Sequence, residues 1–195
     1  MKRFLIILFG VLALMALYVV TARNGLVSLD EGVNEKWAQV ENVYQRRADL
    51  IPNLVNTVKG YAVHEKTTLE DVIKARAAAI NPQLAVAGAP HSEAEMKAFE
   101  SSQNALTGML SKLMVVVEKY PDLKANESFL ALQSQLEGTE NRITVERQRY
   151  NEVVREYNTK TRSFPTNIVA GVFDFERRAL FTAKPGSDTV PEVKF

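Results

Sequence analysis

The side chains of this sequence best suited to acid–base or metal chemistry are two histidines, His64 and His91. His64 is followed by Glu65, as in the HExxH motif, in which two histidines one helical turn apart hold a zinc ion. The place of the second histidine is taken by Thr68, whose hydroxyl cannot replace an imidazole as a zinc ligand. We therefore predict that His64 lies on the surface or at a helix junction and binds no metal.

Other catalytic patterns are missing. The 195 residues contain no cysteine, which excludes thiol catalysis, zinc–thiolate sites, iron–sulfur clusters and disulfides. They also contain no GxSxG elbow, no phosphate-binding glycine loop and no GxGxxG fingerprint. A di-metal carboxylate bundle needs two Glu-x-x-His pairs, but Tyr61 precedes His64 by three positions and His91 falls in an expected loop. We expect no enzymatic activity, no cofactor and no small-molecule substrate, and a hydrolase or metalloenzyme is the least favoured function class.

Charged residues that interrupt apolar stripes are the first candidates for interaction. Arg47 and Glu65 each continue a series of apolar residues spaced by seven, and Glu140, Arg142 and Arg147 interrupt the last long helical pattern in a similar way. Because buried ions have to be paired, salt bridges between helices are one interpretation. A polar seam that binds a partner is the other, and both stay open at this point.

The overall charge argues against nucleic acid as a partner. The chain has 24 Lys and Arg residues against 23 Asp and Glu residues, a net charge of +1. A balanced charge gives no general attraction to a phosphate backbone. The apolar fraction of 46% is that of an ordinary globular protein and argues against disorder of the whole chain.

An uncharged run begins at Phe4 and ends at Ala22. Nineteen helical residues at about 1.5 Å each span roughly the ~30 Å hydrocarbon core of a bilayer. Lys2 and Arg3 favour a cytoplasmic amino terminus, which places everything after Arg23 outside the cytoplasm. We predict a single-pass anchor in the inner (cytoplasmic) membrane, with the rest of the chain periplasmic or extracytoplasmic. A cleaved signal peptide is the alternative, because small residues near the end of the run suit a cleavage site.

Apolar residues at helical spacing predict four long helices after this run, with no competing strand pattern. The first two are expected over residues 26–47 and 50–80, because Asp49 suits an N-cap and Pro52 is tolerated in a first turn. The apolar stripe keeps its phase across this junction, so a single kinked helix is the alternative. Residues 81–91 are expected to form a loop.

The other two helices have clear boundary signals. A capping box of Ser92 and Glu95 predicts the start of the third helix, which Pro121 ends. Asn126 is the expected N-cap of the fourth, which ends before Pro165. Sustained seven-residue repeats and short connections favour antiparallel neighbours. The predicted fold is therefore all-α: an amino-terminal transmembrane helix followed by an antiparallel up-and-down four-helix bundle.

The chain divides into three expected parts: the anchor over residues 1–25, the bundle over 26–163, and a short irregular segment with a flexible tail over 164–195. The last part places aromatic residues outside the bundle, among them Phe173, Phe175 and Phe181. An aromatic strip in such a place has to cover something. These rings cover either their own helices or a neighbouring molecule, and we count them as further interaction candidates.

Long stretches of the chain resemble the LemA family of bacterial membrane proteins. The resemblance runs from the membrane segment to about Phe175, with modest departures at Ala48 and Val63. The stretches that carry it are Trp37, residues 45–55, residues 58–61, His64 and Glu65, residues 120–126, residues 140–143, Tyr150 and Asn151, Tyr157 and Asn158, and Phe164 with Pro165.

The resemblance implies one transmembrane helix and an antiparallel helical bundle outside the cytoplasm. It implies no established enzymatic activity and supplies no catalytic residues. Members of the family are loosely associated with cell-envelope maintenance and with membrane proteases. The anchor, the missing catalytic patterns and the aromatic strip lead us to expect a membrane-anchored scaffold that forms homo-oligomers and organises envelope proteins. A signalling or stress adaptor that binds one membrane protease or receptor is the alternative.

Overall fold

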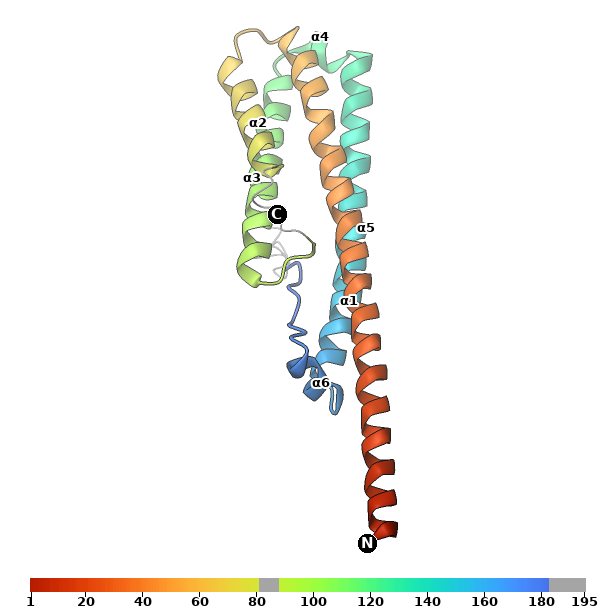
Figure 1. Cartoon of the computed structure of the whole chain (residues 1–195). Coiled ribbons are helices and arrows are strands. Elements are labelled where there is room, and N and C mark those ends of the chain that lie inside the picture. Colours follow the sequence, from red (N-terminus) through yellow and green to blue (C-terminus); the bar gives the residue numbers. More distant parts are fainter. Residues whose placement is uncertain (81–87, 183–195) are drawn as a thin grey trace, which may run out of the picture.

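All regular elements in the described part of the computed structural model, residues 1–80 and 88–182, are helices. Figure 1 shows that the four long helices run alternately up and down, so the expected all-α, antiparallel up-and-down bundle is confirmed. The helices are α1 (Lys2–Lys59), α2 (Lys66–Ala79), α3 (Glu93–Val117), α4 (Pro121–Lys124), α5 (Glu127–Arg162) and α6 (Thr166–Val172).

The favoured break after Arg47 was wrong, because α1 continues through Pro52 as one helix of 58 residues. Asp49 consequently lies inside this helix and is not an N-cap. Proline has no N–H, so the carbonyl of Ala48, four residues earlier, loses its donor within the helix. Arg76 of α2 replaces that donor, with its Nε–H 2.7 Å from the Ala48 oxygen. Helix α2 thus supplies the missing hydrogen-bond donor at the position where the sequence predicts a helix end.

The helix boundary instead falls at a turn over residues 60–65, which separates α1 from α2. His64 lies in this turn and is exposed, in agreement with its prediction as a surface or junction residue. Of the expected loop at 81–91, residues 88–91 are not helical, and residues 81–87 lie outside the described residues. The expected flexible tail beyond residue 182 also lies outside them.

Both remaining start signals are confirmed. The Glu95 N–H donates to Ser92 Oγ at 3.2 Å, and the Ser92 N–H donates to Glu95 Oε2 at 3.3 Å, which completes the capping box of α3. Asn126 Oδ1 accepts a hydrogen bond from the Phe129 N–H at 3.0 Å at the start of α5. Each cap satisfies backbone donors that the first turn of a helix leaves free.

The core is divided along the bundle into two parts. An aliphatic cluster fills the end farthest from the amino terminus, between α1, α2, α3 and α5. An aromatic cluster lies nearer the amino terminus, and its buried rings are Trp37, Tyr44, Phe99, Tyr150, Tyr157 and Phe181. Burial of these side chains is the main force that holds the helices together.

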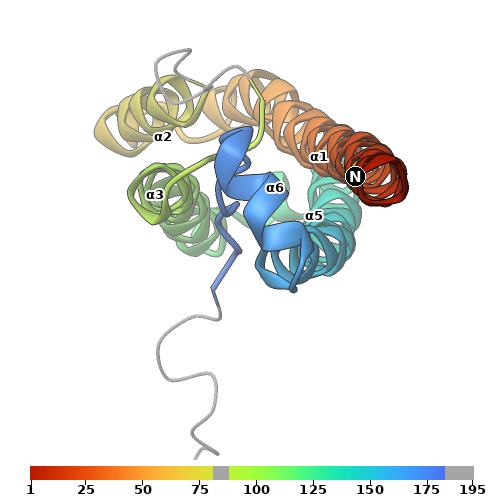
Figure 2. The same ribbon diagram turned by 60° about the horizontal axis from the view of Figure 1, so that its bottom comes forward.

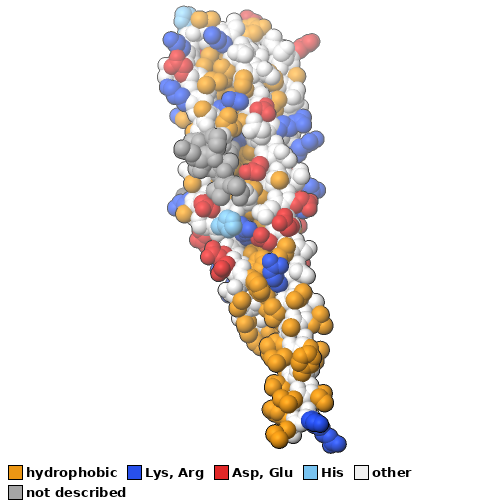
Figure 3. Space-filling model, viewed as in Figure 1, with side chains coloured by type: hydrophobic (Ala, Val, Ile, Leu, Met, Phe, Trp, Pro, Cys, Tyr) orange, Lys and Arg blue, Asp and Glu red, His pale blue; other side chains and the backbone are white. Residues whose placement is uncertain are grey.

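The first turns of α1 project beyond the bundle without protein neighbours (Figure 1). Residues 1–18 are all exposed, and none of the most apolar 18-residue window of α1 is buried. We call this projecting part of α1, residues 1–18, the shaft. In Figure 3, apolar side chains dominate the shaft, with basic side chains at its tip. Among the described helices, α1 is the one long and apolar enough to cross a membrane.

Candidate functional site

The most buried charge in the bundle is the guanidinium of Arg47, a residue that is 3% exposed. Its Nη1 donates to Glu140 Oε2 of α5 at 3.0 Å and to Thr107 Oγ1 of α3 at 3.1 Å. Its Nη2 donates to Gln103 Oε1, also of α3, at 2.6 Å. Of the two interpretations of these charges, the salt bridge between helices is the one that applies to Arg47 and Glu140.

Gln103 extends this network to a fourth element. Its side-chain Nε2–H donates to the carbonyl of Ala79, the last residue of α2, at 2.9 Å. Gln103 is buried. Sequence reasoning missed it, although it lies seven residues from both Met96 and Leu110 and so is in phase with the apolar stripe of α3. The network therefore joins α1, α2, α3 and α5, and it positions helices.

Arg178 is the centre of a second network that the sequence did not reveal. The residue is buried, and its Nη2 and Nε donate to Asp30 Oδ1 of α1 at 2.7 and 3.1 Å. Its Nη1 donates to the carbonyl of Ala89 at 3.1 Å. Its backbone N–H and carbonyl each pair with the side chain of Asn158 on α5 at 2.9 Å. These bonds attach the segment after α6 to α1 and α5.

The three aromatic candidates occupy different environments. Phe181 is buried, and its ring centroid lies 5.5 Å from that of Tyr150 and 6.0 Å from that of Trp37. Phe175 is half-buried against the same cluster. Phe173 is 41% exposed, beneath the guanidinium of Arg23 at 5.3 Å. Phe181 therefore belongs to the core of its own chain, and Phe173 is the ring that is accessible from outside.

Two tyrosines hold the chain after α6 through their hydroxyls. Tyr150 donates to the carbonyl of Ala179 at 3.0 Å, and Tyr157 donates to the carbonyl of Glu176 at 2.8 Å. Burial raises the pKa of both phenols, because it penalises the phenolate. Both side chains thus act as neutral donors that support structure.

Two of the remaining charged candidates lie apart from these networks, whereas Arg147 of α5 donates to Glu100 Oε1 of α3 at 2.6 Å. Glu65 is half-buried at the N-cap position of α2, in the turn that carries His64. Arg142 is exposed on α5. The structure thus brings Arg47 and Glu140 together but does not bring Glu65 or Arg142 to them.

In residues 1–80 and 88–182, no group of three or more acidic, His or Cys side chains is placed to hold a metal ion.

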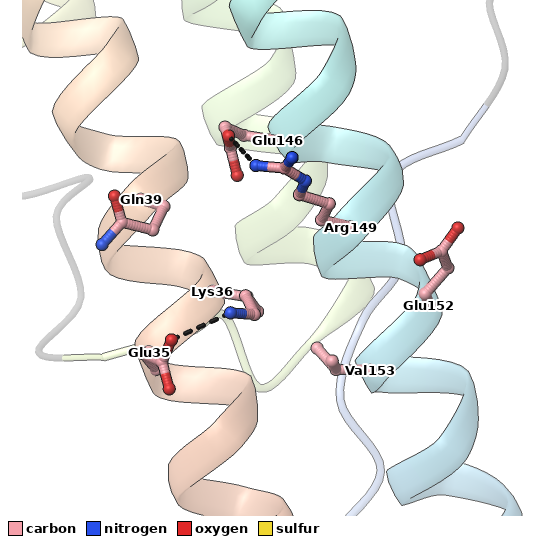
Figure 4. A pocket seen from close by; sticks show the side chains of 7 residues that line it. All are labelled: Glu35, Lys36, Gln39, Glu146, Arg149, Glu152 and Val153. Atoms are coloured by element: carbon pink, nitrogen blue, oxygen red, sulfur yellow. Dashed lines mark hydrogen bonds and ion pairs between the residues drawn. The ribbon is translucent and has the colours of Figure 1, made fainter.

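A polar cleft of about 450 Å³ lies between α1 and α5 (Figure 4). Lys36 donates to Glu35 at 2.8 Å, and Arg149 donates to Glu146 at 2.7 Å. The hydrogen bond and charge of Lys36 lower the pKa of Glu35. Both cations in the cleft are therefore paired with carboxylates of their own helix. The lining residues are Glu35, Lys36, Gln39, Glu146, Arg149, Glu152 and Val153.

An apolar groove of about 530 Å³ lies between the end of α1 and α2, at the end of the bundle farthest from the amino terminus. Val63 and Ile73 are exposed there, with relative exposures of 70% and 40%. Three lysines and one glutamate stand among the apolar residues. We call this the distal groove, and its lining residues are Val55, Lys59, Val63, Lys66, Leu69, Glu70, Ile73 and Lys74.

Comparison with known proteins gives a family and two kinds of relative. The LemA family model matches residues 36–195. Magnetosome protein MamQ 2 of Paramagnetospirillum magneticum is 26% identical over 184 residues, covering 85% of this chain and 66% of its own length. Magnetosome protein MamQ of Magnetospirillum gryphiswaldense is 24% identical over the same shares. Protein LemA of Metamycoplasma hominis is 26% identical, covering 93% of this chain and 80% of its own length.

The chain thus spans just under two thirds of the length of its magnetosome relatives. The family model covers far more than half of the chain. It includes the Arg47 network, the distal groove and Arg178, whereas Asp30, the partner of Arg178, precedes the matched residues. The chain belongs to the LemA family.

Proposed function

We propose that this protein is a membrane-anchored, non-enzymatic scaffold that self-associates at the cell envelope. One observation carries the proposal. The apolar amino-terminal part of α1 projects from the bundle, and it continues without a break into the part of α1 that packs within the bundle. An apolar helix on the surface of a protein is stable in a lipid bilayer, which hides its side chains from water. In this proposal, residues 4–22 span the inner membrane.

The orientation follows from the charges at the tip of α1. Lys2 and Arg3 precede the apolar residues, and basic flanks favour the cytoplasmic side. The bundle then lies outside the cytoplasm. A chain without cysteine makes this testable, since one engineered cysteine is its only thiol. In intact cells a membrane-impermeant maleimide should label Ser134→Cys in the bundle. It should label a cysteine inserted between Met1 and Lys2, which keeps both basic residues, only after lysis. The reverse pattern would contradict the proposed orientation.

Confinement to a membrane supports the proposed self-association. One anchor per chain holds all copies in a plane and raises their effective concentration, so weak lateral contacts can build an oligomer. The magnetosome relatives are named for a cellular structure and not for a reaction, which also supports a structural role.

Cross-linking at native expression tests this proposal. Lysine-reactive cross-linking in native membranes should give a ladder of homo-oligomers, and the detergent-extracted complex should contain several copies of the chain. A version of the chain without residues 1–22 serves as the matched control and should give a weaker ladder at the same total concentration. A strictly monomeric ladder from the full chain would contradict self-association.

The distal groove favours a second candidate function, that of an adaptor for one envelope protein. Its occupant would be an amphipathic helix with acidic residues beside its apolar face, because Lys59, Lys66 and Lys74 surround the apolar floor. Two copies that met groove to groove would bring lysines against lysines, and like charges oppose such contact. The groove therefore fits a foreign partner better than the groove of a second copy.

A designed peptide tests the adaptor function. Full-length protein in nanodiscs should bind an amphipathic helix with acidic flanks about tenfold more tightly than the same helix with lysine flanks, and added salt should reduce the difference. Ile73→Asp should abolish this binding. Val145→Asp is the matched control, because Val145 is similarly exposed but lies on α5. Equal affinity for the two peptides would rule out the groove as the binding surface.

A further inference from the structure

The short helix α6 packs against α1 at the point where the bundle meets the free shaft. The hydroxyls of Tyr18 and Thr166 share a hydrogen bond of 3.2 Å. Leu26 of α1 is buried with Val169 and Ala170 of α6. Figure 2 shows α6 across this end of the bundle, next to α1 and α5. One side of α6 is therefore occupied by its own chain.

The opposite side of α6 presents large apolar side chains to the outside. Ile168 and Val172 are 59% and 70% exposed, and they lie four positions apart on one face of the helix. Phe164, just before the helix, is 81% exposed, and Phe173 follows it at 41%. Four exposed apolar side chains within ten residues form a patch of the kind that marks an interaction surface.

This patch is continuous with the apolar surface of α1. Tyr18, the partner of Thr166, lies within the uncharged run that ends at Ala22. Partly buried Val19 packs in the same cluster as Val169. Figure 3 shows apolar side chains running from the shaft onto the base of the bundle. Whatever surrounds the last turns of the uncharged run therefore also reaches α6.

We infer that α6, with Phe164 and Phe173, is a second membrane contact that lies in the interface of the outer leaflet. The inference rests on the anchoring half of the proposed function, not on self-association. Lipid is the occupant because the patch adjoins the proposed membrane-spanning residues. Arg23 and Arg162 are exposed at this end of the protein, where cations can bind lipid phosphates.

The contact gives the bundle a second point of attachment. A single spanning helix can tilt and rotate about its own axis in the bilayer. Insertion of one face of α6 beside the shaft restricts that rotation, because the patch lies on one side of α1 only. The bundle then presents a defined side toward neighbouring molecules.

Site-directed spin labelling of the full chain tests the inference. Ile168→Cys and Val172→Cys variants are labelled with a nitroxide and reconstituted at one copy per ten nanodiscs, so that occupied discs hold a single chain. Collision with oxygen, which concentrates in lipid, is compared with collision with a water-soluble nickel chelate. Leu12→Cys reports the spanning helix, and Val145→Cys reports an exposed apolar position on α5. Circular dichroism checks that each variant keeps its helicity.

The oxygen-to-nickel ratio at positions 168 and 172 should exceed that at 145 severalfold and approach that at 12. A ratio equal to that at 145 would overturn the inference, and so would low collision with both reagents, which indicates cover by protein. If position 12 also behaves as water-exposed, the anchoring itself fails. Because each disc holds one chain, the outcome does not depend on self-association.

Discussion

Arg47 on α1 and Glu140 on α5 are 93 positions apart in the sequence, and their side chains form an ion pair of 3.0 Å. The pair is asymmetric, since the arginine side chain is 3% exposed and the glutamate side chain is 53% exposed. The arginine also has neutral partners on α3, whereas the glutamate faces solvent on its other side. The two residues should therefore differ in their importance for stability.

Arg47→Ala should lower the free energy of unfolding by about 2–4 kcal/mol, because it removes a buried side chain and leaves Gln103 without its partner. Glu140→Ala should cost more, about 3–5 kcal/mol, because it leaves the buried guanidinium of Arg47 without the carboxylate that pairs with it. Arg142→Ala is the control, and its exposed side chain should contribute less than about 0.5 kcal/mol. Urea unfolding of the full chain in mild detergent measures all three, and equal losses for Arg47 and Glu140 would contradict the asymmetry.

Arg178→Met should release the segment after α6 from the bundle. Its guanidinium reaches Asp30 and the Ala89 carbonyl from different nitrogens, so Arg178→Lys should fail to restore the attachment. Amide hydrogen exchange should show faster exchange at Phe181, whose N–H donates to Asn151 at 2.9 Å, in both variants. Arg177→Met is a control at an exposed neighbour. Unchanged exchange in Arg178→Met would show that the remaining contacts, among them the hydrogen bonds of Tyr150, Tyr157 and Asn158, hold the segment without the guanidinium.

Phe181→Ala should destabilise the bundle by about 3–5 kcal/mol, because it opens a cavity beside Trp37 and Tyr150. Phe173→Ala should cost less than about 1 kcal/mol of stability, because its ring is 41% exposed. Thermal unfolding followed by circular dichroism separates the two. A large loss for Phe173 would mean that this ring supports the core.

High pH should destabilise the bundle through Tyr150. Burial raises its pKa, so the folded protein keeps this proton when the unfolded chain begins to lose it near pH 10. Its contribution is therefore complete below about pH 10 and falls as the pH rises further, by up to about 1.4 kcal/mol per pH unit. Tyr150→Phe should cost about 1 kcal/mol at pH 8 and lose stability less steeply above pH 10. Identical slopes would contradict a shielded phenol, and urea midpoints from pH 8 to 11 provide the measurement.

Arg76→Met should weaken α1 around Pro52 by about 1–2 kcal/mol, since it leaves the Ala48 carbonyl without a donor. Hydrogen exchange in residues 48–56 should increase more than in residues 30–40. Lys74→Met, on the same helix, is the control. An even increase along the whole of α1 would indicate general destabilisation.

The helix-start signals in the sequence were reliable where the capping side chain and its backbone partner lie within one helical turn. The capping box at Ser92 and the cap at Asn126 gave the starts of α3 and α5, because their partners are three residues away. The helix break predicted near Pro52 was wrong, because the donor that compensates for this proline comes from another helix.

The polar networks were harder to predict from the sequence. The phase of Arg47 within an apolar stripe gave its burial but not Gln103, the buried partner on α3. Arg178 follows the last helix with no periodic pattern around it, so only the fold brings it to Asp30.

In the proposed arrangement, with residues 4–22 in the membrane, the uninterrupted length of α1 also determines how far the distal groove stands from the lipid. From Ala22 to Lys59 the helix rises about 1.5 Å per residue, or roughly 55 Å along its axis. A protein with a small extracytoplasmic part would pass beneath that level without meeting the groove. The height of a candidate partner above the membrane surface is therefore a selection criterion in its own right.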